Sequence, residues 1–482
     1  MFEIVLGLVI AVCLLNLFFQ KGSGPPVVPY LVPFLGHTAI LQRRAAEFLN
    51  ECREKYGSVF TIHYLGERVV VFSGSEAREM MKIPDLIVKE PRDRIMSFSD
   101  AIGEWKGAQG YPEHRILTEA VVKSNVTSLL KDILPSLLTR IDRVVLEQLG
   151  DIRKPIVIDA HIFVSEIVVS TVALLLVGQP LSENKELKTI MKNYYSQIEA
   201  IITLGLKWKL FPFVGNQIAQ FLIRAKTPSI RIRQEIKNII TSSYIIRKAQ
   251  VDPPPATNVM DNLIDEGHDL DTVAHLVMAL TFAAVSTTSN ACISLLADLL
   301  AFPEFINRLK LEQKQVLKDA QVIDGRPVVT KEHLEKMEHL DSAIRETLRH
   351  RAHRVELWRS PSKPHTLKNG MHLTQGSLMA VDCTSLHFDE QEYPSPFEYR
   401  PFRFVGLGLN ATRVNGTFTG FGSGKHACPG RFFAVQEITA IMSILLRECD
   451  FSTLDGKPGP FVTNTIFPKN YRAVLSANTY LA

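Results

Sequence analysis

The stretch Phe421–Phe433, "FGSGKHACPGRFF", places Cys428 between a glycine-rich turn and an expected helix. Lys425, His426 and Arg431 surround this cysteine, and positive charge favours the thiolate form of a cysteine side chain. The six cysteines of the chain are scattered without a Cys-x-x-Cys pair. This spacing argues against a disulfide framework or a zinc site and favours a reducing compartment. The segment therefore predicts a thiolate with a function of its own.

The spacing Phe421-x-x-Gly424-x-x-x-Cys428-x-Gly430 predicts a loop that holds a haem iron by a thiolate. Gly424 allows a tight turn beneath a flat macrocycle, and Gly430 lets backbone amides approach the sulfur. We expect Pro429 to be the first residue of a helix with Cys428 as its N-cap, where the dipole favours the thiolate. Phe421 is expected to pack beside the sulfur and limit water. By chance the four positions coincide about 0.001 times in such a chain; the alternative is a structural cysteine in a glycine turn.

An apolar stretch near the N-terminus runs from residue 4 to residue 19 and contains one polar residue, Asn16. As a helix it would span about 24 Å, against about 30 Å for a bilayer core. It lacks a basic leading segment and an Ala-x-Ala cleavage site. We therefore expect residues 1–20 to form an uncleaved single-pass anchor, the alternative being a buried N-terminal helix. Lys21, Arg43 and Arg44 favour a cytoplasmic position for the domain beyond this stretch.

The rest of the chain predicts one large helical domain. Residues 21–33 are rich in glycine and proline and predict a short tether, followed by a catalytic domain over 34–482. Helical periodicity dominates 116–305, with the longest helix expected over about 270–300 and another over 331–350. Alternation around Gly66 predicts a β-hairpin over 60–72, and short strands are expected within 365–382. The expected fold class is mainly α with a small β region.

Composition disfavours one broad class of function. The net charge is +4, from 54 basic and 50 acidic residues, and no basic run interleaved with aromatic residues occurs. A nucleic-acid partner is therefore not expected.

Together with two further motifs, the cysteine loop resembles that of the cytochrome P450 family. "ETLR" matches the family's Glu-x-x-Arg at Glu346 and Arg349, and "PFRF" supplies Arg403 of the next loop in the family pattern. The resemblance covers nearly the whole chain after the tether. It implies the P450 fold, with a long central helix over a haem b and the cysteine loop beneath it. It also implies that Cys428 is the axial thiolate ligand and that Glu346, Arg349 and Arg403 form a buried structural cluster.

Glu-x-x-Arg is a weak motif, and "ELWR" supplies a second copy at Glu356 and Arg359. We choose the first copy because it ends the 331–350 helix. Family order implies that Arg359 pairs with a haem propionate, and His426 has a similar implied role, the alternative being a solvated surface histidine. In the N-terminal half, "EWKGAQGYPEHRIL" meets neither Trp-x-x-x-Arg nor His-x-x-x-Arg. Arg115 is the candidate there, and an ordinary exposed arginine is the alternative.

The expected long helix carries "FAAVSTTS" at residues 282–289. The family pattern has an acid followed by threonine, so Ser286 replaces the acid and Thr287 keeps the place of the threonine that helps deliver protons to bound oxygen. Thr288 completes the motif. The resemblance implies that these three side chains have catalytic roles, whereas a Thr–Thr pair in a helix often only bonds back to the i−4 carbonyl.

The resemblance implies a haem-thiolate monooxygenase that inserts one atom of O2 into a small apolar substrate. The motifs look closest to those of fungal membrane-bound members that act on terpenoid, steroid or polyketide-like compounds in secondary metabolism. Electrons from NADPH would come through a separate cytochrome P450 reductase, with cytochrome b5 as a further candidate, because no flavin or nicotinamide motif occurs here. The implied location is the endoplasmic reticulum membrane, with the catalytic domain facing the cytosol.

Two other functions remain open. The missing acid at Ser286 motivates a P450-fold isomerase or dehydratase that needs no external electrons. A non-catalytic haem sensor is the third hypothesis. The substrate is not predicted, although 96–110 and 201–213 are expected to line its pocket.

Overall fold

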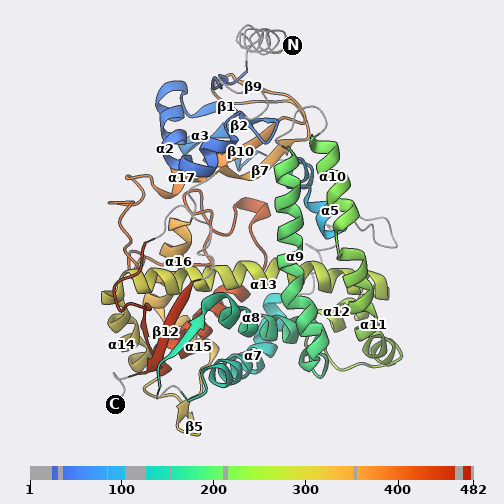
Figure 1. Ribbon diagram of the computed structural model, residues 1–482, viewed down its shortest axis with the longest axis vertical. Helices are drawn as coiled ribbons and strands as arrows, with labels where there is room; N and C mark the ends of the chain where they lie inside the picture. The colour runs from blue at the N-terminus through green and yellow to red at the C-terminus, as the bar shows by residue number, and fades with distance from the viewer. Residues whose placement is uncertain are drawn as a thin grey trace.

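A 32-residue helix, α13 (Leu270–Ala301), crosses the molecule from one side to the other (Figure 1). The Asp269 side chain begins it by accepting a hydrogen bond from the Thr272 N–H, and it ends before Pro303. The prediction of a long helix over about 270–300 is confirmed. The computed structural model describes residues 24–30, 36–83, 85–103, 126–151, 154–209, 215–351, 355–461 and 471–478.

The other helices are α2 (Thr38–Tyr56), α3 (Gly74–Met80), α4 (Lys89–Met96), α5 (Phe98–Ile102), α7 (Val126–Leu149), α8 (Ala160–Val177), α9 (Lys185–Lys209), α10 (Gly215–Lys226), α11 (Ser229–Lys248), α12 (Val259–Asp265), α14 (Ile306–Val316), α15 (Lys331–Glu335), α16 (Glu338–His350), α17 (Cys383–His387) and α18 (Arg431–Glu448). Short 3-10 helices are η1 (Leu181–Glu183), η2 (Pro303–Phe305) and η3 (Gly424–His426). The strands are β1 (Val59–Tyr64), β2 (Glu67–Phe72), β3 (Leu86–Ile87), β4 (Ile156–Asp159), β5 (Val322–Ile323), β6 (Arg326–Pro327), β7 (Val355–Pro361), β8 (His365–Thr366), β9 (His372–Leu373), β10 (Leu378–Asp382), β11 (Cys449–Ser452) and β12 (Arg472–Ala477).

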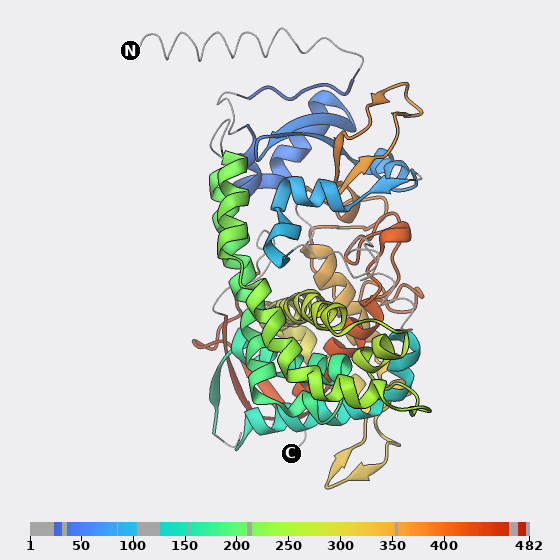
Figure 2. The ribbon, with the colours of Figure 1, turned by 90° about the vertical axis from the view of Figure 1, so that its right-hand side faces the viewer.

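A five-stranded sheet, in the order β1-β2-β10-β7-β3, occupies one end of the molecule with α2 and α3 beside it (Figures 1 and 2). The hairpin predicted over 60–72 is present, with Val59 opposite Phe72. Its turn uses Leu65 and Gly66, both at positive φ. The predicted mainly helical fold with a small β region is therefore correct.

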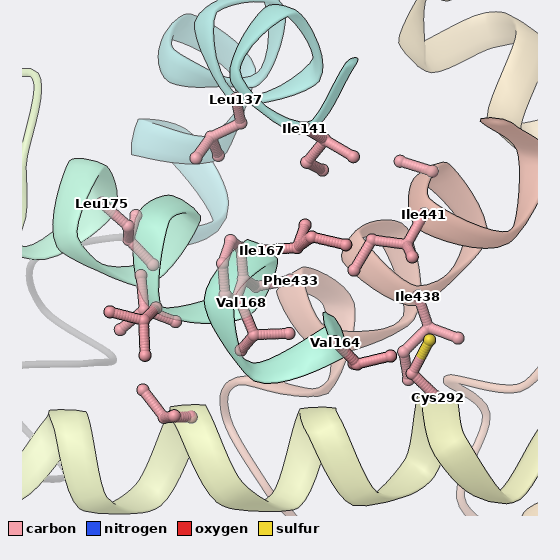
Figure 3. Packing of buried hydrophobic residues seen from close by; sticks show 14 of the residues in the cluster. Leu137, Ile141, Val164, Ile167, Val168, Leu175, Cys292, Phe433, Ile438 and Ile441 are labelled. Carbon is pink, nitrogen blue, oxygen red and sulfur yellow. The ribbon is translucent and has the colours of Figure 1, made fainter. Parts of the chain in front are cut away.

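The largest hydrophobic core lies at the opposite end, where α8 packs between α7 and α13 with α18 alongside (Figure 3). Val164, Ile167 and Val168 of α8 are almost fully buried, as are most of the apolar residues of this helix. Both α8 and α13 are long and apolar enough to cross a bilayer, yet 78% and 67% of their apolar windows are buried. We therefore assign both to the core. The expected anchor over 1–20 lies outside the described residues.

Two expectations about secondary structure were wrong. The helix expected over 331–350 is divided into α15 and α16, because Met337 has a non-helical backbone (φ −81°, ψ 63°) and is fully buried. The strand β4 was not predicted within the helical stretch. It forms by pairing with β12 near the C-terminus, a long-range contact that local periodicity does not reveal.

Candidate active site

The cysteine loop is closed by backbone hydrogen bonds. The Cys428 N–H donates to the Phe421 carbonyl at 2.7 Å, and Gly422 and Gly424 take φ values of +77° and +59°. Gly424 begins η3, so the tight turn expected there is present. Cys428 is exposed, whereas the four other cysteines of the described chain are buried.

The sulfur of Cys428 faces the start of α18. Surrounding protein atoms displace much of its water despite its exposure, and this desolvation raises the pKa of the thiol. Backbone N–H groups of Gly430 and Arg431 act in the opposite direction by donating to the sulfur. A side chain at residue 430 would place its Cβ 3.9 Å from Sγ. This is an ordinary van der Waals contact, so a small side chain would touch the sulfur without a clash.

The expected start of this helix was wrong by two residues. Arg431 is the first residue of α18 and Gly430 is its N-cap, because Pro429 and Gly430 form a turn instead of the first helical residues. Although the helix begins two residues later than expected, the backbone N–H groups of Gly430 and Arg431 still donate to the Cys428 sulfur. The Arg431 guanidinium also donates to the Cys428 carbonyl at 2.7 Å.

One face of α13 is open although most of the helix is buried. Ala283 and Thr287, one turn apart, are exposed, and Leu280 and Ala284 on the same side are half-buried. The Thr287 hydroxyl donates to the Ala283 carbonyl at 2.7 Å. Its oxygen still has lone pairs available to a partner from the open side.

The other two hydroxyls of "STT" do not share this face. Ser286 is 6% exposed and accepts a hydrogen bond from Asn290 Nδ2 at 3.4 Å. Thr288 is 2% exposed. The three candidates are adjacent in sequence, but the structure leaves only Thr287 among them open to a ligand.

Glu346, which is fully buried, is the centre of an ionic cluster. Arg349 donates to both of its carboxylate oxygens, at 2.8 and 2.9 Å, and Arg403 Nε donates at 3.1 Å. The Arg400 backbone N–H adds a bond of 3.0 Å, and His350 lies 3.4 Å away. Burial alone would raise the pKa of Glu346, but the bonds from Arg349 and His350 outweigh it and lower the pKa to about 2.

This cluster fixes the chain that leads to the cysteine loop. Arg349 Nη1 also donates to the His387 carbonyl at 2.6 Å, and Arg403 donates to the carbonyls of Pro394, Ser395 and Glu398. The end of α16 is thereby joined to α17 and to the segment that precedes the loop. His350 and the Arg400 amide were not identified from the sequence, since no motif marks them.

The sequence matches the family model described as Cytochrome P450 over residues 25–474. The chain belongs to the cytochrome P450 family. Cytochrome P450 monooxygenase 71 of Postia placenta is 28% identical over 459 residues, which cover 91% of this chain and 88% of that protein. Cytochrome P450 monooxygenase paxQ of Penicillium paxilli is 27% identical and covers 63% of this chain and 60% of its own length.

A solved P450 confirms the fold. Retinoic acid-bound cyanobacterial CYP120A1 superposes with a TM-score of 0.68 at 21% identity, covering 94% of this chain and 99% of that one. With its fungal monooxygenase relatives, this P450 is an oxidoreductase of the monooxygenase class. Family membership implies a haem with a cysteine thiolate ligand.

The residues of this P450 fit such a group. Cys428 offers an accessible sulfur with N–H donors, and α13 offers an open face. Arg359, on β7, is 7% exposed, and desolvation lowers the pKa of its guanidinium to about 10. Arg359 Nη1 donates a hydrogen bond to the neighbouring Trp358 carbonyl at 2.8 Å. Among the described residues no carboxylate pairs with Arg359, so this buried cation suits an anionic group of a ligand.

The structure describes only one of the two remaining candidates for binding a haem propionate. His426 is exposed at the end of η3, within the cysteine loop. Arg115 lies outside the described residues.

Aromatic residues beside the open face were missed by the sequence analysis. The ring of Phe282 lies 5.3 Å from that of Phe98 and 5.4 Å from that of Tyr195, between centroids. These rings come from α5, α9 and α13, so no local pattern joins them. Phe98 falls within the 96–110 segment expected to line the substrate pocket.

Proposed function

We propose that this P450 is a membrane-anchored haem-thiolate monooxygenase that inserts one atom of O2 into a small apolar organic substrate. The observation that carries the proposal is the exposed Cys428 sulfur, which receives N–H donors from Gly430 and Arg431. A thiolate-ligated haem, when bound, supplies the activation of O2 that C–H oxidation requires. Cys428 would be its iron ligand, and Phe421, half-buried in the same loop, would limit water near the sulfur.

Arg359 and His426 would bind the haem propionates, with Arg115 as the candidate from the N-terminal half. A buried guanidinium without an anion is unfavourable, and a carboxylate would remove that penalty. Glu346, Arg349 and Arg403 would serve the fold, since their bonds join α16 to the segment before the loop. The first group of residues would bind the cofactor, whereas the second group would stabilise the fold.

Thr287 would hold a proton donor on the open face of α13, assisted by Ser286 and Thr288. Its hydroxyl donates to Ala283, so the lone pairs of its oxygen remain to accept a hydrogen bond from water or substrate. Thr287→Ala should leave haem incorporation intact and lower product formation by about ten- to a thousand-fold. NADPH should still be consumed, with its electrons leaving as hydrogen peroxide.

Ser289 offers a matched control for this experiment. Its hydroxyl makes the same i−4 bond, to the Val285 carbonyl at 2.7 Å, but it is 5% exposed. Ser289→Ala should keep the wild-type ratio of product to NADPH. A wild-type ratio in Thr287→Ala would instead remove Thr287 from proton delivery.

The proposed substrates are terpenoid, steroid or polyketide-like compounds of fungal secondary metabolism. Two features support an apolar substrate: the half-buried rings of Phe98 and Phe282, and similarity to fungal monooxygenases. Electrons would come from NADPH through a separate reductase, with cytochrome b5 as a further donor. Expression with that reductase and untargeted product analysis should yield a compound heavier by one oxygen atom.

The decisive test of the haem assignment is spectroscopic. Cys428→Ala should abolish the thiolate-type spectrum of the reduced CO complex, because no other side chain would supply the sulfur ligand. Cys52→Ala, at a buried position in α2, should preserve it. Persistence of the spectrum in Cys428→Ala would refute the ligand assignment.

Ser286 stands where the family has an acid, and this favours a second candidate function: an isomerase or dehydratase that works without external electrons. Turnover without NADPH and reductase would favour it, whereas strict dependence on both would exclude it. A spectral response to ligands with no product under any condition would favour the sensor hypothesis.

Residues 1–20 are proposed to anchor the protein in the endoplasmic reticulum membrane, with 21–33 as the tether and 34–482 facing the cytosol. Removal of residues 1–20 should shift the protein from the membrane fraction toward the soluble fraction while preserving the CO spectrum. Unchanged partition would show that the folded domain binds the membrane by itself.

A further inference from the structure

His387 joins the Glu346 cluster to the segment that enters the cysteine loop. It is the last residue of α17 and is fully buried. Its backbone carbonyl accepts from Arg349 Nη1 at 2.6 Å, and its ring Nδ1 lies 3.1 Å from the Arg349 carbonyl. Its other ring nitrogen, Nε2, accepts a hydrogen bond from the Thr419 backbone N–H at 2.8 Å. One imidazole therefore links the end of α16 to the residue two positions before Phe421.

These contacts fix the tautomer of His387. A backbone N–H can only donate, so Nε2 must present its lone pair to Thr419. The ring hydrogen then lies on Nδ1 and donates to the Arg349 carbonyl. The Thr419 hydroxyl also lies 3.0 Å from Nε2, and it donates to Cys383 Sγ at 3.7 Å. The neutral imidazole thus uses both of its nitrogens, one toward α16 and one toward the loop.

Two further backbone hydrogen bonds lead from Thr419 to the cysteine. The Thr419 carbonyl accepts from the Gly422 N–H at 2.8 Å, which closes the turn that contains Phe421. The Phe421 carbonyl accepts in turn from the Cys428 N–H at 2.7 Å. The position of the Cys428 backbone therefore depends on the turn that starts at Thr419, and His387 holds that residue by its N–H.

Ring packing keeps the imidazole in place. The His387 ring is stacked on Phe418, with 5.5 Å between centroids and 15° between planes. The Arg345 guanidinium carbon lies 3.8 Å from the centre of the Phe418 ring, and a Cβ at Gly420 would stand 2.7 Å from Cζ of that ring. Phe418 is thus packed closely against both the imidazole and the chain that enters the loop.

We propose that His387 is a positioning residue for the cysteine loop: its Nε2 lone pair holds Thr419, and through that turn it sets where Cys428 presents its sulfur. The proposal rests on the proposed function, in which Cys428 is the haem ligand. Loss of a group that orients a metal ligand commonly lowers metal affinity by about ten- to a hundred-fold. The cluster around Glu346 stabilises the fold, and His387 connects that rigid centre to the ligand loop.

Asparagine and glutamine separate the roles of the two ring nitrogens. The glutamine amide oxygen reaches the position of Nε2, so His387→Gln keeps an acceptor for the Thr419 N–H. The asparagine amide reaches only the position of Nδ1, so His387→Asn keeps the bond to Arg349 and loses the one to Thr419. Haem retention, measured by transfer to apomyoglobin, should fall by about ten-fold in His387→Asn and stay near wild type in His387→Gln. The reduced CO complex should also lose its thiolate-type spectrum faster in His387→Asn.

Amide hydrogen exchange tests the path in the protein as purified and needs no turnover. The N–H groups of Thr419, Gly422 and Cys428 should open together and share one protection factor in the wild type. All three should exchange about ten-fold faster in His387→Asn, and at the wild-type rate in His387→Gln. Unequal protection of the three groups in the wild type would overturn the proposal, even if neither variant folded.

Tyr393→Phe is the matched control on the same segment. The Tyr393 hydroxyl donates to the Thr417 carbonyl at 3.1 Å, two residues before Thr419, and this side chain is also buried. Its removal should leave haem retention and the three exchange rates unchanged. Equal losses in His387→Asn, His387→Gln and Tyr393→Phe would overturn the proposal, because His387 would then only stabilise the fold. Failure of wild-type protein to form any product, with exchange as expected, would instead count against the monooxygenase function and leave the positioning role intact.

Discussion

Two copies of Glu-x-x-Arg stand close together in this chain, and their arginines have opposite electrostatic environments. Glu346 and Arg349 lie on α16, where three residues make nearly one turn, and both are 0% exposed and fully paired. Glu356 and Arg359 lie on β7, where three residues extend over about 10 Å. Arg359 is also buried, but only desolvation shifts the pKa of its guanidinium.

The difference shows that the arginine of a Glu-x-x-Arg motif can either stabilise the fold or be available to bind a ligand. A buried arginine that meets a carboxylate inside the protein has its charge compensated, and removal of either partner destabilises the fold because the other charge stays buried. A buried arginine whose anion is not supplied by the described chain is unfavourable until a ligand supplies one. The secondary structure around each copy decides between these outcomes.

The largest expected effect comes from Glu346→Gln. Arg349 and Arg403 would lose their shared anion while staying buried, which should lower the free energy of unfolding by about 3–5 kcal/mol. Urea denaturation measures this change. The pKa of Glu346 is depressed to about 2, so its contribution should persist above the ordinary carboxyl range and fade only as pH falls toward 2.

Glu356→Gln is the matched control in the second copy. Glu356 is half-buried on its strand, so the expected change is within about 0.5 kcal/mol. A loss as large as that of Glu346→Gln would break the comparison between the two copies.

Arg359→Met should have a smaller effect, which differs in sign between the stability of the haem-free protein and its retention of haem. The haem-free protein should unfold at the same or slightly higher urea concentration, because a desolvated charge has gone. Haem retention should weaken by about ten-fold, or about 1.4 kcal/mol. Transfer of haem to apomyoglobin measures that retention.

Arg349→Met supplies the contrast, since it should destabilise the haem-free protein. If Arg359→Met retained haem as the wild type does, the propionate role of Arg359 would be wrong.

The most gradual effect, spread over several pH units, concerns a buried carboxyl that pairs with no cation among the described residues. Glu437 on α18 bonds to Thr171 of α8, and burial raises its pKa to about 8. The folded state therefore keeps a proton that the unfolded state releases above its ordinary pKa. Stability should fall as pH rises from about 4.5 to about 8, by up to about 1.4 kcal/mol per pH unit.

Glu437→Gln should remove that slope, as measured by urea denaturation across this pH range. Glu448→Gln, near the end of the same helix and half-buried, should leave it in place. An unchanged slope in Glu437→Gln would assign the pH dependence to other groups.

Local patterns predicted the parts of the fold that depend on neighbouring residues. Periodicity located α13 and the hairpin of β1 and β2, and the cysteine spacing located the closed loop with its left-handed Gly424. The end of α16 favoured Glu346 over Glu356 as the acid of a cluster. The expectations for Arg115 and for residues 1–20 stay predictions.

Only the tertiary structure decided what surrounds these residues. Phe282 of α13 meets the Tyr195 ring of α9, and Glu437 meets Thr171 across the core. Arg359 pairs with no carboxylate among the described residues, although Glu356 stands three residues before it in the motif. Short-range spacing sets backbone conformation, and so the sequence determined where the thiol and the threonine would stand. Desolvation and pairing depend on segments distant in sequence, which is why the charge state and partner of each buried group emerged only with the folded chain.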